Sequence, residues 1–295
     1  MQQKFKLNEW VLIWLKTYKK IMVKPSTYDS YLTYAVNVTC ETFLEDLTIF
    51  DIQCMVNDMV AEGKATSTIK HMLTITRQSL VKARKLGLVS DLSCMEGIEL
   101  PRARKKPVLP FSDYQLQAIM SNLQRTYYAD LYRALLWTGC RIGELIALRW
   151  SDVDLFNKVI YIRNTDYKGK LQSVKTDDGN RILPMNDSLY RLFRRLCSSG
   201  SRASERVFKN TMGNPIKYRT LLDNWHLFCD NIGIPRAGLH TFRHTFAHQA
   251  LRAGVPVKVV SAWLGHSDVY ITLQIYDSVS AEDLSAAAQI LENVF

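Results

Sequence analysis

The stretch that does most to decide the expected fold is residues 239–251, LHTFRHTFAHQAL. It holds three histidines, His240, His244 and His248, together with Arg243. In a helix, residues four apart share one face, so the three histidines would lie in a row. Such a face can hold a metal ion, bind an anion, or form a polar surface without a function. The rest of the sequence has to distinguish these interpretations.

A zinc site is disfavoured at this stretch. It contains no H-E-x-x-H motif, no carboxylate, and no cysteine pair that would complete the ligand set. A cation such as Arg243 would repel a metal ion but attract an anion. We therefore interpret the stretch as an anion site formed by His240 and Arg243, with His244 and His248 as structural residues. We expect no metal and no cofactor.

Length, charge and cysteine usage narrow the class of protein. The chain has 295 residues, a net charge of +10 and 47% hydrophobic residues, which is typical of a globular protein with a polyanionic partner. Residues 1–110 and residues 111–295 each carry a net charge of +5, so both halves can face the same polyanion. The six cysteines form no C-x-x-C pair, which favours reduced thiols. We see no signal peptide or membrane span and expect a cytoplasmic protein.

The first 100 residues predict an all-helical domain. Apolar residues recur at helical spacing in residues 7–20, 25–37, 45–61 and 65–86. Residues 101–110, PRARKKPVLP, contain three prolines and four basic residues, and cannot form a regular helix or a central strand. We interpret them as a linker whose basic side chains contact a phosphate backbone: Arg102, Arg104, Lys105 and Lys106.

Residues 111–295 predict a second domain of mixed composition. Helices are expected at residues 113–125, 127–138 and 141–148, and again after Pro184. Three strands are expected at residues 159–163, 170–175 and 181–183. The turn signal Asp177–Asn180, DDGN, would join the last two strands as a hairpin.

Six polar residues of this second domain form a pattern when they are taken together. They occur in the motifs TGCRIGELIALRW (residues 138–150), VKTDDGNRILP (174–184), LHTFRHTFA (239–247), WLGHSD (263–268) and ITLQIYDSV (271–279). The six residues are Arg141, Lys175, His240, Arg243, His266 and Tyr276. In this order and with these neighbours, the chain resembles the tyrosine recombinases of the phage-integrase family over most of residues 111–295, and more loosely over residues 7–100.

The chemistry can also be argued from the residue types. Arg141 and Arg243 would grip the non-bridging oxygens of a phosphodiester and stabilise the charge of the transition state. Tyr276 would be the nucleophile, with His240 as the base that takes its proton. His266 would donate a hydrogen bond to the phosphate, and Lys175 would protonate the leaving oxygen. Glu144 is expected to orient an arginine or a helix without a chemical step.

The resemblance implies a mainly α fold with a small antiparallel β-sheet: a helical, SAM-like core-binding domain followed by a mixed α/β catalytic domain. It implies a site-specific recombinase that cleaves and rejoins DNA through a 3′-phosphotyrosyl link, without metal or ATP. Because the expected helices begin near residue 7, we expect no arm-binding domain in this chain, and this expectation favours a short Xer-type or mobile-element recombinase.

The resemblance also implies partners. The chain would act on double-stranded DNA with inverted-repeat core sites, as a homotetramer on two sites, and an accessory directionality factor is left open. An apolar stripe in the C-terminal residues, at Leu284, Ala288, Leu291 and Phe295, predicts a terminal helix that is exchanged between subunits. Two alternatives stay open at this point: a non-cleaving DNA-binding regulator, and an enzyme similar to a type IB topoisomerase.

Overall fold

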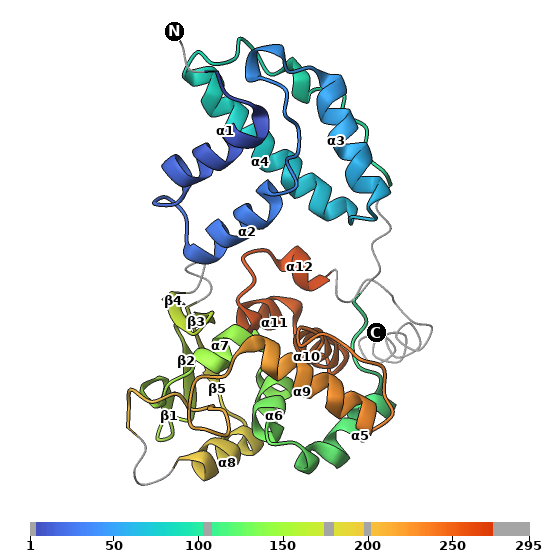
Figure 1. The fold of residues 1–295 in the computed structure, drawn as a ribbon. Helices are drawn as coiled ribbons and strands as arrows, with labels where there is room; N and C mark the ends of the chain where they lie inside the picture. Colours follow the sequence, from blue (N-terminus) through green and yellow to red (C-terminus); the bar gives the residue numbers. More distant parts are fainter. Residues whose placement is uncertain (1–3, 103–107, 174–179, 198–201, 274–295) are drawn as a thin grey trace, which may run out of the picture. The chain divides into compact units, whose positions relative to one another are not determined.

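The computed structural model describes residues 4–102, 108–173, 180–197 and 202–273 (Figure 1). The chain divides into two compact units, residues 1–106 and residues 107–295, which we call unit 1 and unit 2. Most described elements are helices, and the strands are few and antiparallel. The fold is therefore mainly α with a small β component. Among the described residues, no helix combines the length and the apolar composition that crossing a membrane requires.

The described part of unit 1 is built mainly from four α-helices. They are α1 (Leu7–Trp14), which continues into a π-helical turn (Leu15–Lys19), α2 (Pro25–Ala35), α3 (Ile49–Ala61) and α4 (Thr66–Lys85). Pro25 occupies the first turn of α2, where its missing N–H costs nothing. The helix expected from residue 45 begins later, at Ile49, because Thr48 and Asp51 form a capping box there.

The core of unit 1 follows from the amphipathic spacing of these helices. Leu7, Trp10, Val11 and Trp14 of α1 are all buried, as the helical period of the sequence requires. The indole Nε1 of Trp10 donates a hydrogen bond to the carbonyl oxygen of Ser79 at 2.9 Å, which ties α1 to α4. The apolar face of α4 is thereby turned inward, and its polar face is left to solvent.

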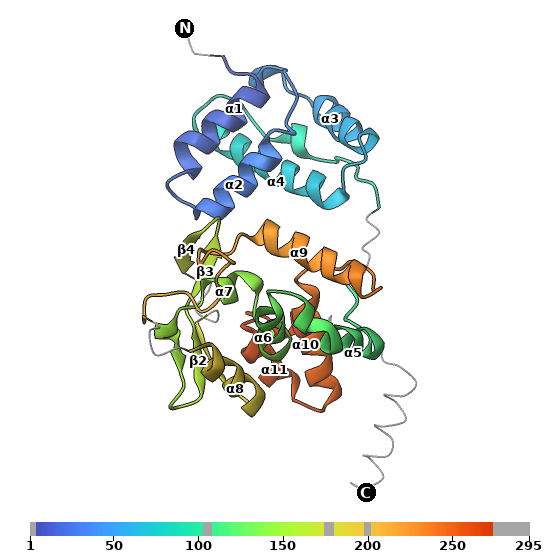
Figure 2. The same cartoon turned by 60° about the horizontal axis from the view of Figure 1, so that its bottom comes forward.

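Unit 2 places eight described helices around a buried aromatic cluster. They are α5 (Asp113–Asn122), α6 (Ala129–Thr138), α7 (Ile142–Ala147), α8 (Asp187–Leu196), α9 (Tyr218–Asn231), α10 (Thr241–Arg252), α11 (Val257–Leu264) and α12 (Val269–Leu273). Figures 1 and 2 show the small sheets at one side of these helices and α5 at the opposite side.

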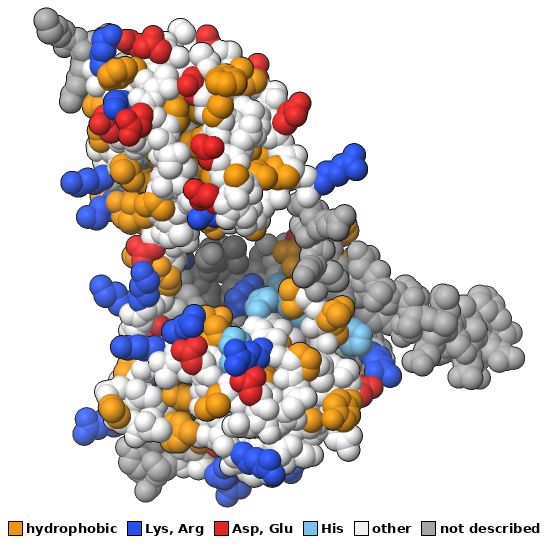
Figure 3. Space-filling view, turned by 45° about the vertical axis from the view of Figure 1, so that its right-hand side comes forward, with side chains coloured by type: hydrophobic (Ala, Val, Ile, Leu, Met, Phe, Trp, Pro, Cys, Tyr) orange, Lys and Arg blue, Asp and Glu red, His pale blue; other side chains and the backbone are white. Residues whose placement is uncertain are grey.

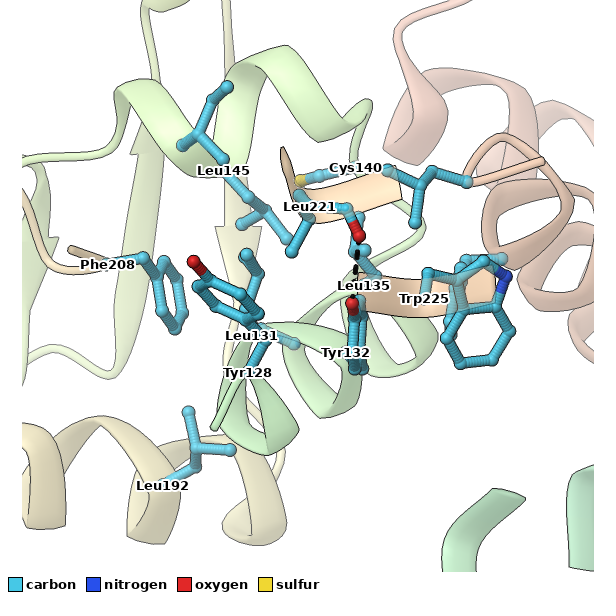
Figure 4. Close-up of a cluster of buried hydrophobic side chains, with 14 of the residues drawn as sticks. Tyr128, Leu131, Tyr132, Leu135, Cys140, Leu145, Leu192, Phe208, Leu221 and Trp225 are labelled. Atoms are coloured by element: carbon cyan, nitrogen blue, oxygen red, sulfur yellow. Dashed lines mark hydrogen bonds between the residues drawn. The ribbon is translucent and has the colours of Figure 1, made fainter. Parts of the chain in front are cut away.

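Figure 4 shows the aromatic core of unit 2, in which Tyr132 of α6 and Trp225 of α9 lie side by side. The Tyr132 hydroxyl donates to the carbonyl oxygen of Leu221 at 3.1 Å. Phe242 of α10 packs against both rings, with centroids 5.7 Å from Tyr132 and 4.6 Å from Trp225. Because Phe242 is fully buried, these contacts fix the rotation of α10 and therefore the direction of the next side chain, Arg243.

The prediction that a turn at Asp177–Asn180 joins two paired strands as a hairpin is wrong. The strands β4 (Lys170–Ser173) and β5 (Arg181–Pro184) do not pair with each other. Instead β4 pairs with β3 (Asn164–Tyr167), and β5 pairs with β2 (Val159–Ile162), which also pairs with β1 (Val153–Asp154).

Turn chemistry and burial explain this pairing. Lys168 and Gly169 both have positive φ, at 52° and 83°, which suits a two-residue turn between β3 and β4. The pairing of β2 with β5 sets Ile160 opposite Leu183, and both side chains are fully buried. The DDGN sequence favours a turn that would pair β4 with β5. The turn at Lys168 and Gly169 pairs β4 with β3 instead, and burial of Ile160 and Leu183 pairs β5 with β2.

Candidate active site

The junction between α6 and α7 places the first candidate residue, Arg141. Gly139 ends α6 in the left-handed conformation, with φ 62°, and a Cβ there would lie 2.4 Å from Phe246 Cδ1. Only glycine fits this close approach without a shift of its neighbours. Arg141 then caps α7, and its guanidinium donates to Glu144 Oε1 at 2.8 Å and to the carbonyl oxygen of Gly265 at 3.3 Å.

Arg243 lies on α10 and is almost fully buried, with 2% of its surface exposed. Its Nη1 donates to the carbonyl oxygen of Gly139 at 3.1 Å, and its Nη2 to that of Leu264 at 2.7 Å. Burial, and after it the charge of Arg141, lower the pKa of Arg243 to about 9. Arg243 therefore still carries its charge at neutral pH, but in an environment that favours the arrival of an anion.

One residue of this site was missed by sequence reasoning. Arg181, the first residue of β5, donates its Nη2 to Glu144 Oε2 at 2.8 Å and its Nη1 to Glu144 Oε1 at 3.2 Å. Its Nε donates to the carbonyl oxygen of Trp263 at 2.7 Å. The strand period contained the signal, because Arg181 and the buried Leu183 share a face of β5. An arginine that faces inward needs a buried partner.

Glu144 is the carboxylate that joins these arginines, and we call Arg141, Arg181, Arg243 and Glu144 the arginine cluster. Burial by itself would raise the pKa of Glu144, but the hydrogen bond and charge of Arg181, followed by Arg141, hold it below its usual value. Glu144 is therefore ionised, which fits the orienting role expected of it.

Two histidines border the cluster. Loss of hydration, and then the neighbouring His244 and Arg243, lower the pKa of His240 to about 4, although part of its side chain is exposed. Loss of hydration, followed by Arg243 and Arg141, lowers the pKa of His266 to about 4. The Nδ1 of His266 lies 2.8 Å from Oγ1 of the buried Thr272. Both imidazoles are therefore neutral at pH 7.

Within residues 239–251, the rings of two histidines are in contact with each other. The rings of His240 and His244 meet edge to face with centroids 4.9 Å apart, and burial followed by Arg243 lowers the pKa of His244. Within the part of the chain that the structure describes, no group of three His, Cys, Asp or Glu side chains is placed to hold a metal ion. Figure 3 shows histidine and basic side chains next to one another on one face of unit 2.

Several residues expected at the site lie outside the described residues. They are Lys175, Tyr276, the linker residues Arg104, Lys105 and Lys106, and the C-terminal stripe from Leu284 to Phe295. Arg102 is described and exposed. Arg141, His240, Arg243 and His266 come from three segments, because His240 and Arg243 both belong to the start of α10. The contacts of α6, α7, α10 and α11 with one another bring them together.

Comparison with known sequences finds a matching family and several relatives. Residues 111–283 match the Phage integrase family. The chain is 26% identical to a tyrosine recombinase XerC-like protein of Caldanaerobacter subterraneus subsp. tengcongensis, over 98% of this chain and 83% of the relative. It is 31% identical to tyrosine recombinase XerA of Saccharolobus solfataricus, over 63% of this chain and 57% of the relative.

Solved structures show the same fold at low sequence identity. The integrase of the Tn1549 transposon, in complex with transposon right end DNA, superposes with a TM-score of 0.82 at 19% identity, over 98% of this chain and 100% of the other. A lambda integrase tetramer bound to a Holliday junction gives a TM-score of 0.70 at 18% identity, over 89% of this chain and 78% of the other.

Proposed function

Because the chain belongs to the phage integrase family, we propose that it is a site-specific tyrosine recombinase that cleaves and rejoins DNA through a 3′-phosphotyrosyl intermediate. The observation that carries the proposal is the arginine cluster, in which Arg141 and Arg243 converge from separate helices beside two neutral histidines. Two guanidinium groups fixed in one place suit a phosphodiester and the charge that builds on it in the transition state.

The proposed reaction exchanges one phosphoester bond for another. The Tyr276 oxygen attacks the phosphorus, the bond to the 5′-oxygen breaks, and the DNA is left joined to the protein through its 3′-phosphate. Attack by a 5′-hydroxyl of another strand reverses the step and releases Tyr276. Because a phosphoester bond is kept throughout, no ATP is required.

Proton transfer accompanies each half of the reaction. His240 is neutral at pH 7 and can accept the Tyr276 proton, and a bound phosphodiester would offset the nearby cations and raise its basicity. Lys175 would protonate the leaving oxygen. If the Thr272 hydroxyl donates to Nδ1 of His266, the ring proton lies on Nε2, where it can donate to a phosphate oxygen.

Binding of the duplex is assigned to both units and to the linker. α4 carries Lys70, Arg77, Lys82, Arg84 and Lys85 and no acidic residue, so its exposed face can neutralise phosphates. Unit 1 would be the core-binding domain and unit 2 the catalytic domain, with residues 101–110 as the basic linker. We also propose inverted-repeat core sites, a homotetramer on two sites and exchange of the C-terminal segment between subunits, with an accessory directionality factor left open.

Covalent trapping tests the proposal. The protein is mixed with a nicked duplex that carries the inverted repeat from the ends of its own element or chromosomal locus. Wild type should form a denaturant-resistant protein–DNA adduct, and Tyr276→Phe should form none. Tyr270→Phe is the matched control, because Tyr270 lies six residues earlier and is 61% exposed on α12.

The outcomes separate the competing functions. A stable complex without an adduct, with or without magnesium, would replace the proposal by a non-cleaving regulator. An adduct formed by a monomer that relaxes supercoiled DNA would indicate a topoisomerase instead. An adduct that is lost in Tyr270→Phe and kept in Tyr276→Phe would overturn the assignment of the nucleophile.

A further inference from the structure

The C-terminal end of α11 has an arrangement that the proposed chemistry does not by itself explain. Gly265 is left-handed, with φ 67°, and its N–H donates to the carbonyl of Ala262, while the N–H of His266 donates to that of Ser261. This Schellman arrangement occupies the carbonyls of Ser261 and Ala262. The next three carbonyls of the helix end need donors from elsewhere.

Three arginines supply those donors. The carbonyl of Trp263 accepts from Arg181 at 2.7 Å, that of Leu264 from Arg243 at 2.7 Å, and that of Gly265 from Arg141 at 3.3 Å. Successive carbonyls of one helix end therefore hold three guanidinium groups side by side. The negative end of the helix dipole favours this concentration of positive charge.

Carboxylate contacts, together with exposure, separate the three arginines by role. The side chain of Arg141 is 43% exposed, so a ligand can reach it. Arg243 is 2% exposed, but its hydrogen bonds go to backbone carbonyls and not to a carboxylate, so no ion pair within the described residues offsets its charge. Arg181 meets both oxygens of Glu144 with two nitrogens, the paired geometry in which an arginine–carboxylate interaction is strongest. Arg181 therefore faces Glu144 and α11.

Charge accounting shows what this pairing achieves. Glu144 is ionised and touches both Arg141 and Arg181. When Arg181 offsets the negative charge of Glu144, the charges of Arg141 and Arg243 both stay available to an anion. Without Arg181, Glu144 would pair with Arg141 alone and compete with the phosphate for it.

We infer that Arg181 is a positioning residue of this site, which holds Glu144 and the end of α11 so that Arg141 and Arg243 can share one phosphate. This inference rests on the proposed function for its biological meaning. Its physical content, anion binding that depends on Arg181 through Glu144, can be measured without DNA.

The test uses inorganic sulfate as the probe on the full chain. The rise in melting temperature with sulfate concentration at pH 7.5 is fitted to give an apparent dissociation constant, which we call the sulfate midpoint. Arg181→Met should raise that midpoint about tenfold, because Glu144 then competes for Arg141. Adding Glu144→Gln to Arg181→Met should return the midpoint to within about twofold of wild type, since the competing charge is gone. A merely structural role for Arg181 predicts instead that the second substitution worsens the first.

Matched variants exclude general effects of sulfate and of lost charge. Arg163 directly follows β2, the strand that pairs with β5, and its side chain is 55% exposed. Arg163→Met removes this charge and should leave the sulfate midpoint unchanged. Arg243→Gln should abolish the specific part of the sulfate effect. If Arg181→Met does not fold, Arg181→Lys keeps the charge but loses the paired hydrogen bonds, and a smaller rise in the midpoint is expected.

The results distinguish this inference from the proposed function. An unchanged midpoint in the Arg181 variants, or a deeper loss in the double variant, overturns the inference and leaves the recombinase proposal standing. The expected sulfate pattern in a protein that binds DNA but forms no adduct supports the inference and overturns the recombinase proposal.

Discussion

The two units hold their positive charge in opposite ways. In unit 1 the basic residues of α4 lie within one continuous helix, and Lys70, Arg77, Arg84 and Lys85 are exposed to solvent. In unit 2 the arginines of the cluster come from sequence positions as far apart as 141 and 243, and Arg243 is almost fully buried. The first arrangement needs one helix, and the second needs the whole fold of unit 2.

The two arrangements suit different tasks. Exposed charges suit affinity for DNA, and buried charges suit the chemical step. Exposed lysines and arginines on flexible stems can neutralise phosphates at many positions, and each contributes a salt-dependent share of the binding energy. Buried guanidinium groups held by helix-end carbonyls have a single orientation and stabilise charge that appears at one point. The comparison therefore predicts that substitutions in the two regions will have different kinds of effect.

The largest effect is expected at the cluster. Arg243→Gln should lower the rate of adduct formation by about 10³-fold or more, because it removes a fixed donor to the developing charge. The measurement is single-turnover formation of the adduct at saturating protein. Arg77→Gln on α4 is the matched control and should cleave at nearly the wild-type rate once bound. Similar losses in both variants would end the distinction between the two regions.

A second comparison concerns folding stability after a glycine in each unit is replaced by alanine. Gly139→Ala should destabilise the chain by about 3 kcal/mol, because the left-handed φ is strained and the new Cβ would meet Phe246 at 2.4 Å. Gly63→Ala in unit 1 has φ 73° but meets nothing within 4 Å, so about 1 kcal/mol is expected. Chemical denaturation measures both values. Equal losses would show that backbone strain decides the effect and that close packing at Gly139 does not.

A smaller effect is expected on α4. Lys70→Gln and Arg77→Gln should each weaken DNA binding about tenfold or less, to a similar degree on related and unrelated duplexes. The slope of log affinity against log salt should fall by about one for each phosphate contact that is lost. Titrations at several salt concentrations measure this. A substitution that weakened binding to one sequence only would place that residue among the base-reading contacts.

The smallest effect is expected in the pH dependence of anion binding to the cluster. His240 and His266 have pKa values near 4 in the folded chain, so they are neutral above that pH. Sulfate would offset the neighbouring cations and raise both pKa values, so binding should take up protons and strengthen as the pH falls from 7 to 5. Calorimetry in buffers of different ionisation enthalpy measures the uptake. Release of protons would contradict the assignment.

The same depressed pKa values have a consequence for folding. Between pH 6.5 and 4 the unfolded chain binds protons at His240 and His266 that the folded chain does not bind. The stability of unit 2 should therefore decrease as the pH falls through this range. Bound sulfate should reduce the decrease, because it raises the pKa of both histidines in the folded state.

The sequence by itself determined the helices, the mainly α fold and the recombinase family. Those conclusions rest on local signals, such as the apolar spacing of α1 and the motifs around Arg141 and Arg243. Local signals are readable in sequence because the residues that produce them interact within one or two turns of chain.

Only the tertiary structure decided the strand pairing and the surroundings of the arginines. The DDGN sequence predicted a hairpin between β4 and β5, but β5 pairs with β2 because that pairing buries Ile160 and Leu183. Arg181 was missed because its importance comes from Glu144 and the carbonyl of Trp263, 37 and 82 positions away in the chain. Contacts over such separations are set by packing, which no local period encodes.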